Sequence, residues 1–140
     1  MFLLDTVVVS EMRKPAARRN PMVVSWLDRR AANDLYISVI TLGELERGIE
    51  AQRRINPVFA TQLSVWFDQI LSVYRNQILP MTVPIARRWG RQADRIGHMN
   101  PDLAIAATAI EHGLTVVTRN VSDFTPTGVN VFNPFEEPSP

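Results

Sequence analysis

Short runs of apolar, mostly β-branched residues alternate along this chain with segments long enough to form helices. Each run is bounded by polar residues, proline or glycine, which is typical of a buried strand. The predicted strands are residues 2–4, 35–40, 78–82, 114–118 and 129–132. Because the runs are continuous rather than alternating with polar residues, they favour a mainly parallel sheet that is covered on both faces.

Proline, capping residues and glycine mark the ends of the intervening helices. Asn20 and Asn100 each precede a proline, which places a cap residue before a proline at the first helical position. The predicted helices begin at Pro21, Thr41, Pro57, Pro84 and Pro101, and the last two end at Gly97 and Gly113. The helix from Thr41 to about Arg53 and the one from Pro57 are expected to form a helical hairpin.

A chain of 140 residues with 46% hydrophobic content can bury a core of its own. We therefore expect one domain over residues 1–140, with a proline-rich tail from about residue 133. No apolar run approaches the roughly 20 residues that a membrane span needs. Asp5 also lies where a secretory signal would be positive. These features predict a cytoplasmic protein with no membrane partner.

Composition restricts the chemistry that the chain can perform. It has no cysteine and only two histidines, which excludes disulfides, thiol nucleophiles and cysteine-based zinc sites. Carboxylates must therefore carry any catalysis. Lys14 is the only lysine among 15 basic residues, and this bias towards arginine fits phosphate or protein partners without choosing between them.

Four acidic residues fall at or just beyond the carboxyl ends of predicted strands. Asp5 closes the first strand, and Glu44 lies one helical turn beyond the second. Asp102 lies in the first turn of a helix, and Asp123 follows the strand that ends at Thr118. Ligands of open α/β sheets bind at this edge.

Each acid also has a structural explanation. Thr41 and Glu44 match a capping box, and Asp102 would be favoured by the helix dipole alone. Asp123 could simply turn the chain. Asp5 is different, because a carboxylate at the end of a buried apolar strand is costly unless it is paired or binds a metal.

Taken together, four carboxylates at one sheet edge would repel one another unless a cation lies among them. Oxygen ligands without histidine or cysteine suit Mg²⁺ or Mn²⁺. Such an ion can activate water and neutralise charge during cleavage of a phosphodiester. Two other classes that gather acids at strand ends fit poorly. Haloacid-dehalogenase-type phosphatases need an aspartate at position 7, which is Val7, and in response-regulator receivers Lys14 would lie in the wrong segment.

Three ordered motifs resemble one family over nearly the whole chain. They are LLDT with the following SE at Ser10 and Glu11, ISVITLGELERGI, and DLAIAATAIEHGLTVVTRNVSDF, with VFNPF closing the series. Together they resemble the PIN-domain toxins of the VapC type. The resemblance implies a three-layer α/β/α sandwich, an Mg²⁺- or Mn²⁺-dependent ribonuclease activity and a place in a toxin–antitoxin pair. It also implies a homodimer and an antitoxin that inserts an arginine among the acids.

By position, Asp5, Glu44 and Asp102 match the three core acids of the family. Either Asn120 or Asp123 could supply the fourth, and Asp123 is favoured because it alone is charged. The small hydroxyl residues that line such sites would be Thr6, Ser38 and Thr118. These three could equally be ordinary hydroxyls at strand ends.

The chain departs from the family pattern at Val7, where the family usually has asparagine. Because valine cannot form a hydrogen bond, its presence could weaken metal binding by about 10- to 100-fold. A weakened PIN domain that binds RNA or antitoxin without efficient cleavage is therefore an alternative to an active ribonuclease. A third interpretation, independent of Val7, is a DNA nuclease of the same fold.

Overall fold

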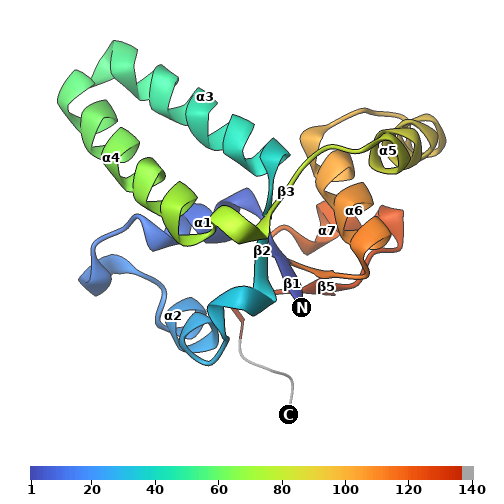
Figure 1. Ribbon diagram of the computed structural model, residues 1–140, viewed down its shortest axis with the longest axis horizontal. Helices are drawn as coiled ribbons and strands as arrows, with labels where there is room; N and C mark the ends of the chain where they lie inside the picture. The colour runs from blue at the N-terminus through green and yellow to red at the C-terminus, as the bar shows by residue number, and fades with distance from the viewer. Residues whose placement is uncertain (137–140) are drawn as a thin grey trace.

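The computed structural model describes residues 1–136 as a sheet flanked by helices (Figure 1). The last part of the predicted tail, residues 137–140, lies outside the described residues. The strands are β1 (Phe2–Leu4), β2 (Leu35–Ser38), β3 (Ile78–Leu79), β4 (Thr115–Val117) and β5 (Val131–Phe132). The helices are α1 (Thr6–Met12), α2 (Pro21–Asp28), α3 (Val39–Ile55), α4 (Pro57–Val73), α5 (Val83–Ile96), α6 (Pro101–His112) and α7 (Val121–Phe124).

The five strands form one sheet in the order β3-β2-β1-β4-β5, and every neighbouring pair is parallel. This confirms the predicted parallel sheet. The chain runs outward from β1 to β2 and β3, and then returns to the other side of β1 to add β4 and β5. The strand order therefore reverses between β1 and β4, which is where open α/β sheets bind their ligands.

Successive residues of the strands supply two separate cores, because side chains alternate between the faces of a sheet. Leu4 and Val117 belong to a cluster that includes residues of α1, α2, α3 and α4. Their neighbours Leu3 and Val116 belong to a second cluster that includes residues of α6 and α7. The predicted three-layer α/β/α sandwich is thus confirmed.

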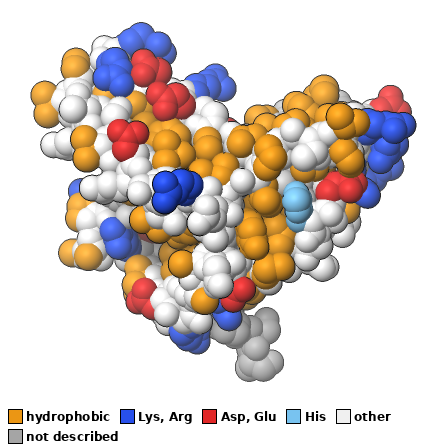
Figure 2. All heavy atoms as spheres, viewed as in Figure 1, with side chains coloured by type: hydrophobic (Ala, Val, Ile, Leu, Met, Phe, Trp, Pro, Cys, Tyr) orange, Lys and Arg blue, Asp and Glu red, His pale blue; other side chains and the backbone are white. Residues whose placement is uncertain are grey.

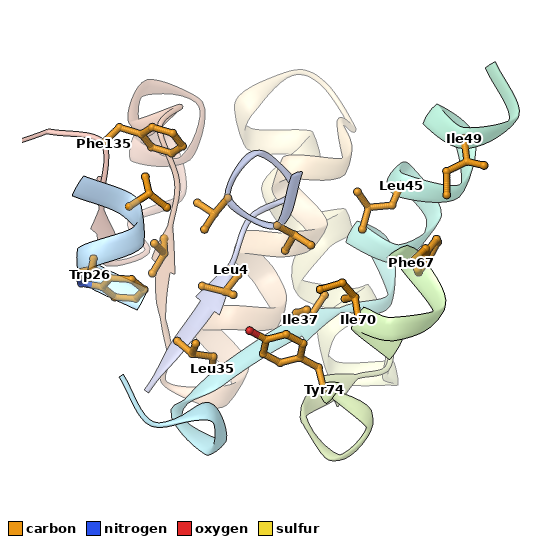
Figure 3. Packing of buried hydrophobic residues seen from close by; sticks show 14 of the residues in the cluster. Leu4, Trp26, Leu35, Ile37, Leu45, Ile49, Phe67, Ile70, Tyr74 and Phe135 are labelled. Atoms are coloured by element: carbon orange, nitrogen blue, oxygen red, sulfur yellow. The ribbon is translucent and has the colours of Figure 1, made fainter. Parts of the chain in front are cut away.

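The predicted hairpin is formed by α3 and α4, which project together from one side of the sheet (Figure 1). Its large side chains turn inward: Phe67 and Ile70 are buried in the first cluster with Ile37 and Tyr74 (Figure 3). Phe67 and Ile70 are therefore core residues of the domain.

Three helices differ from the sequence prediction. Helix α1 contains a run of three β-branched valines and was not predicted. Asp5 caps this helix, and its residues Val8 and Val9 are buried. Helix α7 is only four residues long and was also missed. Helix α3 begins at Val39, earlier than predicted, because the Ser38 hydroxyl accepts a hydrogen bond from the Ile40 amide and ends β2 there.

The start of the predicted tail packs against the domain. Pro134 and Phe135 are buried, and the guanidinium carbon of Arg119 lies 3.9 Å from the centroid of the Phe135 ring. Among residues 1–136, no helix is both long enough and apolar enough to cross a lipid bilayer.

Candidate functional site

Asp5 lies where the strand order reverses, between the carboxyl ends of β1 and β4. It follows β1 directly, caps α1, and is only 4% exposed. Its Oδ1 accepts a hydrogen bond from the Thr6 amide at 2.8 Å, and its Oδ2 accepts one from the Thr118 hydroxyl at 2.7 Å. Both oxygens are therefore held in fixed directions, one by the first residue of α1 and the other by the residue that follows β4.

Burial raises the pKa of Asp5 to about 6. The hydrogen bonds from Thr118 and Thr6 lower the pKa, whereas the nearby charges of Asp102 and Glu44 raise it. The buried position thus outweighs the hydrogen bonds. A buried carboxylate with acidic neighbours is a group that a cation would stabilise in its ionised form.

Glu44 lies one turn inside α3 and faces α1. Its Oε1 accepts a hydrogen bond of 2.6 Å from the Thr6 hydroxyl, whose oxygen also lies 3.3 Å from the hydroxyl oxygen of Thr41. The capping-box explanation for Glu44 is wrong, because Ser38 rather than Thr41 caps α3. Glu44 is therefore directed by a side chain of α1 and not by the start of its own helix.

Asp102 occupies the first turn of α6 and is half-buried. Its burial raises its pKa, and the charges of Glu44 and Asp123 raise it further, while His98 lowers it. Because each of these effects depends on proximity, the four acids form one electrostatic group: Asp5, Glu44, Asp102 and Asp123.

Asn120 and Asp123 contribute differently to this group. The backbone amide of Asn120 donates a hydrogen bond of 3.0 Å to the Thr118 hydroxyl, which in turn donates to Asp5. The side chain of Asn120 is exposed and does not cap α7. Asp123 lies in α7, and its charge raises the pKa of Asp102. Asp123 therefore interacts electrostatically with another acid of the group, which supports it over Asn120 as the fourth member.

The three hydroxyl residues expected near the site have different roles. Thr6 and Thr118 each donate a hydrogen bond to an acid of the group. Ser38 is buried and caps α3, and within residues 1–136 its hydroxyl makes no hydrogen bond to an acid. Val7, at the position of the family asparagine, is half-buried and packs against the first hydrophobic cluster.

The sequence analysis gave Glu11 no structural role, although Ser10 and Glu11 are part of the first motif. Glu11 is buried at the end of α1, where its Oε1 accepts a hydrogen bond of 2.7 Å from the Asn20 amide. Its Oε2 lies 2.8 Å from the Lys14 ammonium. Glu11 therefore connects the end of the helix that Asp5 begins to the cap of α2.

The donor set fits a hard divalent cation in its chemistry, since it consists of carboxylates without a sulfur ligand. The acids are not, however, assembled as a ready-made cage. Within residues 1–136, no three acidic or histidine side chains converge closely enough to hold a metal ion. Mg²⁺ does not require such a cage, because it keeps several waters and usually binds one or two carboxylates directly.

The parallel sheet and the acidic group at its switch point define an α/β fold with a carboxylate site. Comparison with known proteins matches residues 2–124 to the PIN domain model. The chain is 36% identical to "Toxin FitB" of Neisseria gonorrhoeae, over 98% of this chain and 100% of that protein. It is 33% identical to "VapC ribonuclease Y4jK" of Sinorhizobium fredii, over 97% of this chain and 99% of that protein.

The fold of the chain is also similar to that of a solved structure. The crystal structure of FitAcB from Neisseria gonorrhoeae superposes with a TM-score of 0.80 at 35% identity, covering 98% of this chain and 100% of the other. The chain belongs to the PIN-domain family, and it is a member of the VapC type.

Proposed function

We propose that this protein is the toxin of a toxin–antitoxin pair and acts as a metal-dependent endoribonuclease. The observation that carries the proposal is the buried Asp5 at the switch point, held by two hydrogen bonds among other acids that raise its pKa. The similarity to a protein named a VapC ribonuclease and to one named a toxin supports the same function.

In this proposal, Mg²⁺ or Mn²⁺ is held by Asp5 and Asp102 with Glu44 and Asp123 as further oxygen ligands, directly or through water. When bound, the cation would acidify a water ligand and neutralise charge on the phosphodiester oxygens. Thr118 and Thr6 keep Asp5 and Glu44 oriented, so that little side-chain freedom is lost when the ion arrives.

Arginines on both sides of the acidic site would attract the RNA backbone. Helix α5 exposes Arg87, Arg91 and Arg95, and the tip of the hairpin exposes Arg53 and Arg54. Figure 2 shows Lys and Arg side chains over the tip of the hairpin and over α5, on either side of a notch in the outline of the molecule. Basic arms flanking an acidic site would offset the repulsion between the acids and the phosphates.

The test compares RNA cleavage by purified wild type, Asp5→Ala and Asp68→Ala, with Mg²⁺ and with EDTA. Asp68 is an exposed carboxylate on α4, outside the acidic group, so its variant controls for the loss of one charge. We expect cleavage by wild type and Asp68→Ala in Mg²⁺ only, and a loss of at least about 100-fold in Asp5→Ala. Equal cleavage by wild type and Asp5→Ala would refute the proposal.

Two further candidates are separated by the same assay. A weakened PIN domain would bind the RNA in a gel-shift experiment without cutting it, and Val7 is the observation that favours this alternative. A DNA nuclease would cut single-stranded DNA of the same sequence at least as fast as the RNA.

The partners belong to the same proposal. We expect a cognate antitoxin, because the similar solved structures include the complex titled FitAB. We also expect a homodimer, for which α4 exposes the apolar side chains of Val58, Val65 and Val73. Analytical ultracentrifugation of the purified chain tests the dimer, and co-purification with the neighbouring gene product tests the antitoxin.

A further inference from the structure

A cavity of about 240 Å³ opens beside the acidic group, between α1 and the α3–α4 hairpin. Thr6 and Glu44, which hydrogen-bond to each other, line it as well as belonging to the site. A molecule in this cavity would therefore lie directly next to the proposed reaction centre.

The far side of the cavity combines aromatic, cationic and amide groups. Phe59 and Trp66 of α4 are half-buried and form part of its wall. The guanidinium carbon of Arg13 lies 5.8 Å from the centroid of the Phe59 ring. Within residues 1–136, Arg13 forms no ion pair with an acidic side chain, so its charge is available to a ligand.

Two further polar side chains line the cavity, those of Ser10 of α1 and Gln52 of α3. A glutamine amide offers both a donor and an acceptor, and a serine hydroxyl can act as either. Aromatic and cationic faces with a few polar groups at the edges are the features by which proteins bind the unstacked bases of single-stranded RNA.

The size of the cavity also limits its occupant. Pockets for drug-sized ligands measure about 300–1,000 Å³, so 240 Å³ suits a single base and excludes a base pair or a folded helix. Glu44 and Arg13 give the cavity one charge of each sign, and neither charge repels a neutral base.

We infer that this pocket binds one unpaired base of the RNA whose backbone is cut at the acidic group, and that Gln52 and Ser10 contribute to base preference. The inference rests on the proposed ribonuclease function and adds to it a position where sequence is read. Phe59 and Trp66 supply the apolar contact, and Arg13 supplies a cation next to the base or its phosphate.

Gly48 is a position from which an added side chain can fill the pocket. It lies on α3 and lines the cavity, and a Cβ added there would meet no atom within 4 Å. Gly90 on α5 is also helical with an unobstructed Cβ, but it does not line the cavity. Gly48→Trp and Gly90→Trp are therefore a matched pair that adds the same side chain inside and outside the pocket.

The substrate is an RNA hairpin pool with a randomised single-stranded loop, and sequencing of the products gives the relative kcat/KM at each loop sequence. We expect wild type and Gly90→Trp to prefer the same bases near the cut. Gly48→Trp should lose that preference, with kcat/KM at the favoured sites lowered by about 5- to 150-fold, the effect of one lost base stack. Thermal unfolding of each variant verifies that it is folded.

Gln52→Ala tests the edge contact separately, with the exposed Gln62→Ala on α4 as its control. Gln52→Ala should change which base is favoured near the cut, whereas Gln62→Ala should keep the wild-type preference. An abasic nucleotide at the favoured position should lower wild-type kcat/KM as much as Gly48→Trp does.

The outcomes separate this inference from the proposed function. If wild type cuts no RNA in the pool, the proposed function fails and the inference fails with it. If wild type cuts RNA but Gly48→Trp cuts the same sites at the same relative rates, the ribonuclease stands and the base pocket is overturned. In that case the cavity is open to a side chain of a protein partner instead.

Discussion

Replacing Asp5 with asparagine should stabilise this protein in the absence of metal while removing its activity. The unfolded chain ionises Asp5 near the ordinary value of 3.8, whereas the folded protein raises the pKa to about 6. Between these two pH values the folded state binds more protons than the unfolded state. The free energy of unfolding therefore falls as pH rises through this interval, and the loss is complete above pH 6.

The size of the effect follows from the shift in pKa. Each unit corresponds to about 1.4 kcal/mol, so a shift from 3.8 to about 6 corresponds to roughly 3 kcal/mol at neutral pH. Asparagine has nearly the same shape and no charge. Its carbonyl oxygen can accept from the Thr6 amide as Oδ1 does, and its amide can donate to the Thr118 oxygen. We therefore expect a gain of about 2–3 kcal/mol at pH 7.5 and almost none at pH 4.

Thermal unfolding in EDTA, measured from pH 4 to pH 8 by circular dichroism, tests this expectation. The Tm of Asp5→Asn should exceed that of wild type by about 5–10 °C at pH 7.5. Asp68→Asn, at an exposed position, is the control for the loss of one charge, and its Tm at pH 7.5 should be that of wild type. Mg²⁺ should raise the Tm of wild type and not that of Asp5→Asn. If Asp5→Asn is the less stable protein at pH 7.5, or if the difference does not vary with pH, the reasoning is refuted.

Two other substitutions test the surroundings of Asp5. Thr118→Val removes a hydrogen bond that lowers the pKa of Asp5. The pH at which RNA cleavage falls to half should therefore rise by about 1–2 units. A pH–rate profile in Mg²⁺ with an unchanged midpoint would contradict this expectation. Val7→Asn restores the family residue and should lower the Mg²⁺ concentration for half-maximal cleavage by about 10-fold or more. An identical Mg²⁺ titration for Val7→Asn and wild type would show that Val7 does not limit activity.

Sequence patterns predicted the helix ends correctly where the local signals agree with the fold. The proline starts of α2, α4 and α6 and the glycine end of α5 were all predicted, and Gly97 has the left-handed φ of 102° that favours glycine there. Helix α1 was missed because its valines favour a strand when taken locally. Only burial of Val8 and Val9 against the sheet, together with the Asp5 cap, makes that segment helical.

The sequence predicted which residues form the acidic group, but it did not predict the hydrogen bonds that orient them or the cavity beside them. Strand ends identify Asp5, and the topology then brings it to the charges of Glu44 and Asp102. The hydrogen bond from Thr6 to Glu44 could not be predicted, because it depends on α1, which the sequence did not reveal. The cavity beside it, with Phe59 and Gln52, requires the angle between α1 and the hairpin, and no local pattern encodes that angle.

The hydrogen bond between Thr118 and Asp5 joins residues 113 positions apart in a chain of 140. Strand β1 precedes β4 in the chain, so one of its edges is paired, and Asp5 acquires its second partner, only after β4 has been synthesised. An incomplete chain released before β4 would carry Asp5, Glu44 and Asp102 without the Thr118 hydroxyl that orients Oδ2 of Asp5. The order of the strands thus delays completion of the site until Thr118 has been made, after three of the four acids. For the ribonuclease proposed above, this delay would limit cleavage of the message during synthesis.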